Sequence, residues 1–153
     1  MGTDLAGSIR ENFSLAETDL RTLAPLQLAY IGDAVYEIIV RTVVLSKNNT
    51  QVTHLHKAAT KLVCASAQKA VYEIIAGELT EEETGYFKRG RNAKSYTVAK
   101  HASVSDYRIA TGFEALCGFL YLSGQTERLL FLVKMGIDGI AEDTAGKNND
   151  GGR

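Results

Sequence analysis

Two acidic residues lie in segments that otherwise consist of residues suited to a protein core. Asp33 lies within residues 28–37 (LAYIGDAVYE), and Glu114 is the only charged residue in residues 109–122. Carboxylate oxygens are hard ligands, which suit Mg²⁺ or Mn²⁺ better than Zn²⁺. Helical proteins build metal sites from inward-facing acids on separate helices. We therefore predict that Asp33 and Glu114 together bind a metal ion and act as the catalytic residues.

Both acids also have ordinary structural interpretations. Asp33 could form an ion pair with Arg41 or Arg108, and Glu114 could lie on a solvent-exposed stripe of its helix. Glu37 precedes Arg41 by four residues, in the order that favours an ion pair on a helix. We therefore assign Glu37 a structural role.

A basic segment lies between the two acids in the sequence. Residues 84–101 contain five Lys or Arg residues and no acid, whereas residues 72–83 contain five glutamates and no base. Although the formal net charge is only −1, the acidic and basic residues are therefore segregated along the sequence. We predict a short helix followed by an exposed loop that contacts nucleic-acid phosphates through Lys88, Arg89, Arg91, Asn92 and Lys94.

An ordinary solvated loop is the alternative for this basic segment. Lys57 and Lys61, one helical turn apart, are weaker candidates for the same role. For these two lysines a solvated helix face is the favoured interpretation.

The two acids need helices to position them. Pro25, the only proline, suits the first turn of a helix that should run to about Ser46. Apolar residues cover most of its circumference, which predicts a central, buried helix. Ser103 or Ser105 should begin the helix that carries Glu114 and ends at Leu122. Gly112 and Gly118 in that helix indicate close packing or access.

Other helices should connect and cover these two. Their predicted N-terminal caps are Thr50 or Thr53, Ser66, and Thr80 in a capping box, and a last helix should run from Thr126 to before Gly139. No alternating strand pattern occurs, so we predict an all-α fold. The 153 residues should form one domain at residues 20–140, with a partly ordered leader at 1–19 and a disordered tail at 141–153.

Cellular location can be inferred from the cysteines and the apolar runs. Cys64 and Cys117 lie in apolar helical patterns, so we expect reduced core thiols. No apolar run reaches the roughly 18 residues needed to span a bilayer. No targeting signature occurs, so we expect a cytoplasmic protein without a membrane partner.

Residues 28–37 resemble the signature helix of the ribonuclease III family, where a Leu-Glu-Phe-Leu-Gly-Asp-Ala run carries metal-binding carboxylates. Residues 109–122 (IATGFEALCGFLYL) are similar to the family's second catalytic helix. Asp33 matches the signature aspartate, and Glu114 matches the essential glutamate. Ala29 and Thr111 stand where the larger enzymes have acids. These departures, the RGRNAK segment and the lack of a double-stranded-RNA-binding domain resemble the short branch called mini-ribonuclease III.

This resemblance implies a homodimeric, all-α nuclease domain that uses Mg²⁺, with Mn²⁺ as a substitute. It implies cleavage of double-stranded RNA to 5′-phosphate and 3′-hydroxyl ends, and maturation of the large-subunit (23S) ribosomal RNA precursor. A large-subunit ribosomal protein is a further candidate partner. The alternatives are an inactive module that binds ribosomal RNA or ribosomal proteins, and a structural helical adaptor.

Overall fold

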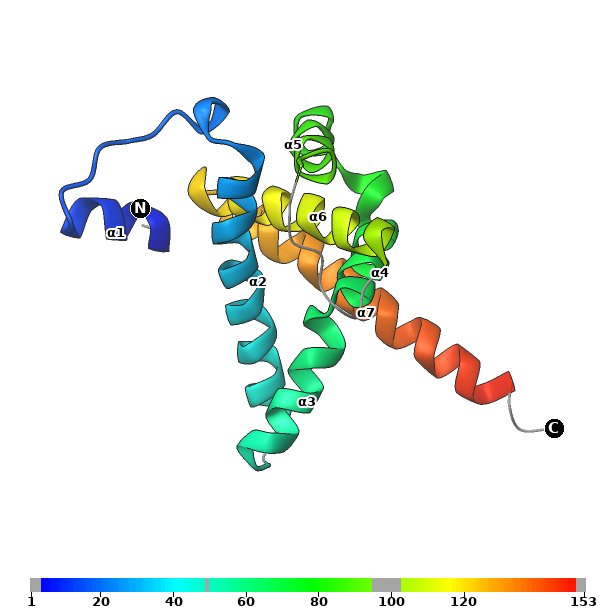
Figure 1. Ribbon diagram of the computed structural model, residues 1–153. Coiled ribbons are helices and arrows are strands. Elements are labelled where there is room, and N and C mark those ends of the chain that lie inside the picture. The colour runs from blue at the N-terminus through cyan, green and yellow to red at the C-terminus, as the bar shows by residue number, and fades with distance from the viewer. Residues whose placement is uncertain (1–3, 49, 95–102, 151–153) are drawn as a thin grey trace.

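The computed structural model describes residues 4–48, 50–94 and 103–150, and all regular structure in those ranges is helical (Figure 1). The predicted all-α fold is confirmed. The α-helices are α1 (Leu5–Asn12), α2 (Pro25–Lys47), α3 (Val52–Val63), α4 (Ala65–Ile75), α5 (Glu81–Arg91), α6 (Val104–Leu122) and α7 (Thr126–Asp150), and single 3₁₀ turns lie at η1 (Leu20–Thr22) and η2 (Ala76–Glu78). None of these helices is both long and apolar enough to span a bilayer.

Helix α6 is the centre of the fold. It packs against α2, α4 and α5, and α2 crosses it at a steep angle in Figure 1. Every residue from Ala110 to Leu120 is buried except Glu114, which is half-buried. The prediction of a central, buried helix therefore fits α6 and is wrong for α2. One face of α2 is open, with Tyr30 82% exposed and Ile38 60% exposed.

Aromatic pairs join the central helices. Tyr36 of α2 meets Phe113 of α6 edge to face, with ring centroids 5.1 Å apart. Tyr86 of α5 stacks on Phe119 of α6 at 3.9 Å. Such pairs contribute roughly 0.5–1.5 kcal/mol beyond the burial of their area. They fix α2 and α5 against the helix that carries Glu114.

The caps predicted for α5 and α6 are confirmed. The Thr80 hydroxyl accepts a hydrogen bond from the Glu83 backbone N–H at 3.1 Å, and the Glu83 carboxylate accepts one from the Thr80 N–H at 2.9 Å. The Ser103 hydroxyl accepts a hydrogen bond from the Asp106 N–H at 3.0 Å. These bonds satisfy backbone donors that a helix leaves unpaired in its first turn.

The caps predicted for α3 and α4 are wrong. Gln51 precedes α3 and Cys64 precedes α4, and neither side chain makes a capping bond. The hydroxyl of Thr50 pairs with His54 Nδ1 at 2.9 Å instead. Thr53 lies inside α3 and Ser66 inside α4. Cys64 is exposed because it lies at the junction of the two helices, so only Cys117 is the buried thiol that we predicted.

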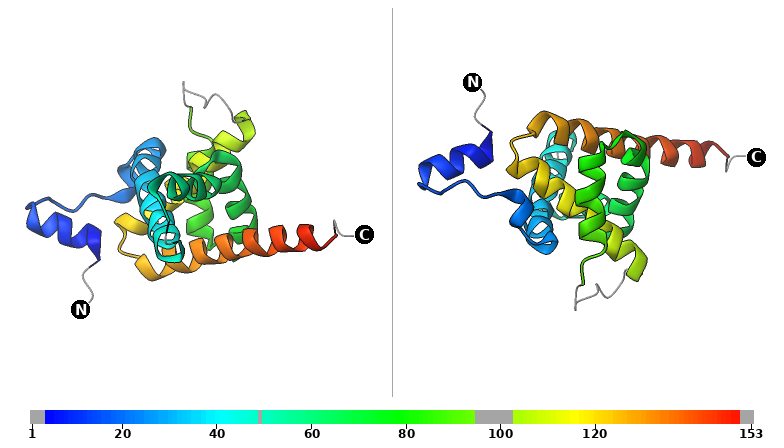
Figure 2. Two further views of the ribbon diagram at one scale, coloured as in Figure 1. Left: turned by 90° about the horizontal axis from the view of Figure 1, so that it is seen from below. Right: turned by 90° about the horizontal axis from the view of Figure 1, so that it is seen from above.

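The two ends of the described chain are more helical than predicted. Helix α1 lies within the predicted leader, and α7 continues past Gly139 to Asp150, beyond the rest of the fold in both views of Figure 2. Residues 141–150 are therefore helical where we predicted a disordered tail. A Cβ atom on Gly139 would lie 2.8 Å from Ile74 Cδ1 of α4. Gly139 thus permits close helix packing and does not end the helix.

Candidate metal site

A glycine contact between α2 and α6 brings Asp33 and Glu114 together. A Cβ atom on Gly32 would overlap the carbonyl oxygen of Glu114 and lie 2.7 Å from its carbon. In the other direction, a Cβ atom on Gly118 would overlap the carbonyl oxygen of Leu28. The two backbones therefore touch directly, as the prediction of close packing at Gly118 requires. Because Asp33 follows Gly32, this crossing places the backbones of the two acidic residues at one helix contact.

Burial and a neighbouring negative charge raise the pKa of each of the two carboxyl groups. Burial raises the pKa of Glu114 to about 7, and the nearby charge of Asp33 also raises it. Asp33 is exposed, but partial burial of its carboxyl group, followed by the charge of Glu37, raises its pKa too. Both shifts mean that the ionised form of each carboxyl group is disfavoured in the folded chain.

Two structural alternatives were given above: an ion pair for Asp33 and a solvent-exposed position for Glu114. Neither is found in the described part of the chain. Arg41 pairs with Glu37, Nε to Oε2, at 2.9 Å, which confirms the structural role of Glu37. No ion pair within residues 4–48, 50–94 and 103–150 includes Asp33 or Glu114. Glu114 is half-buried, so it does not lie on a solvent-exposed stripe.

Gln68 is a site residue that sequence reasoning missed. It lies in the first turn of α4 and is 3% exposed, and its Nε2 group donates a hydrogen bond to the Val63 carbonyl at 2.9 Å. Its side chain also hydrogen-bonds Glu114, which lowers the pKa of that carboxyl group. Its Oε1 atom is buried and has no partner in the described part of the chain. A lone glutamine among small residues carries no sequence signal for this role.

The comparisons with known proteins agree with this geometry. The family model described as the Ribonuclease III domain matches residues 26–125, which include α2 and α6. The chain belongs to the ribonuclease III family. This confirms the resemblance drawn from residues 28–37 and 109–122, and it identifies the chain as a nuclease of a family that uses divalent metal ions.

Relatives within the family cover most of the chain. Mini-ribonuclease 3 of Clostridium tetani is 49% identical over 135 residues, which are 88% of this chain and 89% of the relative. Mini-ribonuclease 3 of Enterococcus faecalis is 49% identical over 126 residues, 81% of this chain and 96% of the relative. An X-ray structure of a Fusobacterium nucleatum protein is 30% identical with a TM-score of 0.72, covering 80% of this chain and 98% of that one.

The two positions named above as departures from the family resemblance are packed into the core. Ala29 is 5% exposed and Thr111 is 8% exposed. The Thr111 hydroxyl donates a hydrogen bond to the Tyr107 carbonyl of its own helix at 2.9 Å. No group of three or more metal-binding side chains occurs in the described residues. The candidate donor set is therefore two carboxylates, and the remaining positions around an ion would be left to water and substrate oxygens.

The basic segment is helical for longer than predicted. Lys88, Arg89 and Arg91 belong to the last turn of α5, and only Asn92 and Lys94 follow the helix. Gly90, within this segment, is buried: a Cβ atom on it would lie 2.7 Å from Ala115 Cβ of α6. Basic residues also suit the negative end of a helix dipole. Lys100 and the other residues 95–102 lie outside the described part of the chain.

The two arginines at this end of α5 have structural partners. Arg89 Nη2 donates a hydrogen bond to the Leu23 carbonyl at 3.1 Å, and its guanidinium lies 5.4 Å from the ring centroid of Tyr86. Arg91 Nε donates to Asn92 Oδ1 at 3.2 Å. Lys88 and Lys94 are exposed. Contact of this segment with phosphates stays a prediction.

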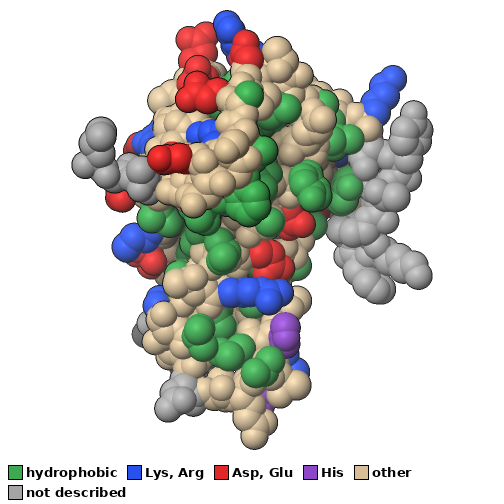
Figure 3. All heavy atoms as spheres, turned by 90° about the vertical axis from the view of Figure 1, so that its left-hand side faces the viewer, with side chains coloured by type: hydrophobic (Ala, Val, Ile, Leu, Met, Phe, Trp, Pro, Cys, Tyr) green, Lys and Arg blue, Asp and Glu red, His purple; other side chains and the backbone are tan. Residues whose placement is uncertain are grey.

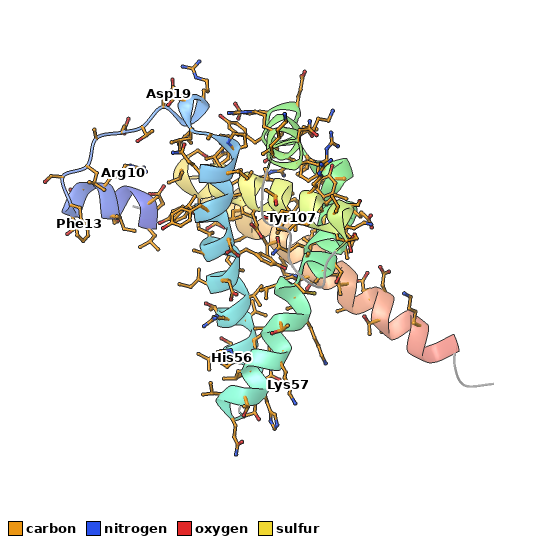
Figure 4. The ribbon with its side chains drawn as sticks, in the orientation of Figure 1. Arg10, Phe13, Asp19, His56, Lys57 and Tyr107 are labelled. Carbon is orange, nitrogen blue, oxygen red and sulfur yellow. The ribbon has the colours of Figure 1, made fainter. Side chains whose placement is uncertain are left out.

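Lys57 and Lys61 are exposed on α3. Figure 4 shows Lys57 on α3, in the lower part of the view and well away from α5 at the top. The structure therefore does not bring these two lysines together with the basic end of α5, and the solvated interpretation remains open for them.

Proposed function

We propose that this chain is an endoribonuclease that cleaves double-stranded RNA with Mg²⁺, or with Mn²⁺ as a substitute. Asp33 and Glu114 are the proposed metal ligands and catalytic residues. The observation that supports this proposal is the backbone contact of Gly32 with Glu114, directly beside Asp33, together with the effect of the Asp33 charge on the pKa of Glu114. Neither acid forms an ion pair with a described residue. A divalent cation supplies that missing charge.

The donor chemistry fits such an ion. Both ligands are carboxylate oxygens, which Mg²⁺ prefers. The unpartnered Oε1 of Gln68 beside them is a buried acceptor that a water molecule at the site would satisfy. When bound, the ion would lower the pKa of a water molecule and stabilise the charge that develops on the scissile phosphate. Products would carry 5′-phosphate and 3′-hydroxyl ends.

Glu114 and Asp33 would have different roles at the proposed site. Glu114 is held by the core, so it provides a fixed ligand, whereas the exposed Asp33 lies on the side from which substrate can approach. Because only two protein ligands are proposed, the ion should bind weakly and keep most of its water. Ionised carboxylates are needed for binding, so affinity should depend on pH.

Substrate binding is assigned to the cationic end of α5. Lys88, Arg89, Arg91, Asn92 and Lys94 would contact backbone phosphates, with Lys57 and Lys61 as secondary contacts. Duplex RNA is recognised mainly by its shape and backbone, which suits such a set. On the family resemblance, the natural substrate proposed is the precursor of 23S ribosomal RNA, presented by a large-subunit ribosomal protein.

A homodimer is proposed because a duplex has two strands and each chain offers one site. The open faces of α1 and α2 support it: Tyr30 is 82% exposed, Ile38 60% and Phe13 73%. Figure 3 shows hydrophobic side chains gathered on this side of the molecule, next to acidic side chains. A second copy that covers these side chains would place two sites on one assembly.

Incubation of a long RNA duplex with the protein and Mg²⁺ tests the proposal. We expect wild-type protein to cut both strands and Asp33→Asn or Glu114→Gln to leave the duplex whole. The loss of acids at Ala29 and Thr111 favours one other function, an inactive module that only binds RNA. A gel shift without cleavage at any concentration of Mg²⁺ or Mn²⁺ would support that module and refute the nuclease.

A further inference from the structure

The side chain of Gln68 is fixed at one end by a backbone carbonyl. Its Nε2 group donates to Val63 O at 2.9 Å, across the junction of α3 and α4. A carbonyl oxygen only accepts hydrogen bonds, so the atom that faces it must be the nitrogen of the carboxamide. This identifies both ends of the amide and sets the plane in which the remaining N–H group and Oε1 lie.

The same carboxamide also interacts with Glu114. Helix α4 packs directly on α6, and Gln68 at 3% exposure is the buried polar residue of α4. Its side chain hydrogen-bonds the Glu114 carboxyl group. An Nε2 group has two N–H donors, so one can serve Val63 O while the other serves Glu114.

The third polar atom has no protein partner. Oε1 of Gln68 is buried, and it accepts no hydrogen bond from any described residue. Leaving such an acceptor unsatisfied costs about 1–3 kcal/mol. A hydrophobic residue of similar size would avoid that cost. The bond to Val63 O explains the nitrogen of this carboxamide, but it does not explain the buried Oε1, for which the neighbouring site offers a reason.

We propose that Gln68 is a positioning residue: Val63 O anchors its carboxamide, the carboxamide orients the Glu114 carboxylate for metal binding, and Oε1 accepts from a water at the site. This inference rests on the proposed metal site and adds a residue to it. With two carboxylates as the only proposed protein ligands, the orientation of each one matters more than in a site with many ligands. Residues that orient metal ligands typically contribute 10- to 100-fold in affinity or activity.

Two variants and one matched control test the proposal. Gln68→Leu keeps the approximate size and removes all hydrogen bonds. Gln68→Asn keeps the carboxamide but is one methylene too short to reach both Val63 O and Glu114. The control is Tyr36→Phe, because the Tyr36 hydroxyl donates to the neighbouring Leu62 carbonyl at 2.6 Å. It loosens the same end of α3 without removing a contact to the Glu114 carboxylate.

Mn²⁺ binding without RNA, followed by electron paramagnetic resonance, is the primary measurement. Melting temperature and the Mg²⁺ concentration for half-maximal cleavage accompany it. We expect Gln68→Leu and Gln68→Asn to weaken Mn²⁺ binding about 10- to 100-fold and to raise the Mg²⁺ requirement in parallel. Excess Mg²⁺ should restore much of the cleavage rate, whereas Tyr36→Phe should lower the melting temperature only.

Three results would overturn the proposal. Folded Gln68 variants could bind Mn²⁺ as wild type does, Tyr36→Phe could weaken Mn²⁺ binding equally, or wild-type protein could fail to bind Mn²⁺. The proposed nuclease function fails separately, if wild-type protein binds Mn²⁺ but leaves duplex RNA uncut. In that case the comparison of Mn²⁺ affinities still decides the role of Gln68.

Discussion

Replacing Gly32 by alanine should separate the two helices that carry the site. The added Cβ atom would overlap the Glu114 carbonyl oxygen and lie 2.7 Å from its carbon. Carbon atoms in contact lie about 3.5–4.0 Å apart, so α2 and α6 must separate by roughly 1 Å or more. No side chain can move aside to relieve this contact, because both partners are backbone.

The expected loss of stability can be worked out from this contact. Overpacking typically costs about 1–3 kcal/mol, and a rigid backbone contact should lie at the upper end. Alanine regains about 1 kcal/mol through its higher helix propensity. The net loss is about 2 kcal/mol, equivalent to a fall in melting temperature of about 4–8 °C for a chain of this size. Cleavage should fall about 100-fold at temperatures where the variant is folded, because misplacement by about 1 Å is enough.

Gly85→Ala is the matched control for this measurement. Gly85 lies inside α5, and a Cβ atom there would meet nothing within 4 Å. This variant should gain about 1 kcal/mol from helix propensity and keep wild-type cleavage. Urea unfolding and Mn²⁺ binding are measured for both variants. If Gly32→Ala is as stable and binds Mn²⁺ as tightly as wild type, the helix crossing does not set the site.

Three further predictions concern charge. Glu114→Gln and Asp33→Asn should abolish cleavage but leave the RNA gel shift in place, and a variant that cuts at the wild-type rate would remove that residue from the site. Because burial raises the pKa of Glu114 to about 7, the affinity for the metal ion should fall about tenfold for each pH unit below that value. An Mn²⁺ affinity that is the same at pH 6 and pH 8 would contradict this. The combined change of Arg89, Arg91 and Lys94 to alanine should weaken RNA binding and flatten its salt dependence, whereas an unchanged salt slope would favour a merely solvated segment.

The raised pKa of Glu114 also predicts the sign of a stability change. In the folded state this pKa is about 7, against an ordinary value of 4.5. The folded chain therefore binds more protons than the unfolded chain between these values, and stability without metal falls as pH rises through them. Glu114→Gln removes this effect, so it should raise the melting temperature at pH 8 in EDTA and have less effect at pH 5. Equal shifts at both pH values would contradict the assigned pKa.

The helices that carry the site could be predicted because their signals are local. Pro25 is the first residue of α2. The Ser103 hydroxyl caps α6 by accepting a hydrogen bond from the backbone N–H of Asp106, three residues later. Asp33 and Glu114 could also be recognised in the sequence, because the apolar residues around each of them are its neighbours along the chain. Their proximity was an inference from the family resemblance, and it depends on a helix crossing that no local pattern contains.

The residues that sequence reasoning misplaced act through tertiary contacts. The N-termini of α3 and α4 lack the predicted capping side chains, and side chains from other helices pair with carbonyl groups at the C-terminal end of α3: Tyr36 donates to the Leu62 carbonyl and Gln68 to the Val63 carbonyl. The last helix was predicted to end before Gly139, although this glycine permits close packing inside α7, as Gly90 does inside α5. A glycine that ends a helix and one that lets a neighbour approach look alike in a single sequence.

Glycine contacts also connect the metal site to the proposed RNA contact. Gly90 of α5 faces α6, where a Cβ atom on it would lie 2.9 Å from Gly112 Cα, and Gly32 of α2 faces the backbone of Glu114. Helix α6 therefore holds the cationic end of α5 and the Asp33 segment through backbone contacts. Backbone contacts vary less than contacts between long side chains, which change rotamer easily. In the proposed complex, the helix axes would therefore set the distance from the carboxylates to the phosphates of the duplex, while the arginine and lysine side chains would adapt to the substrate.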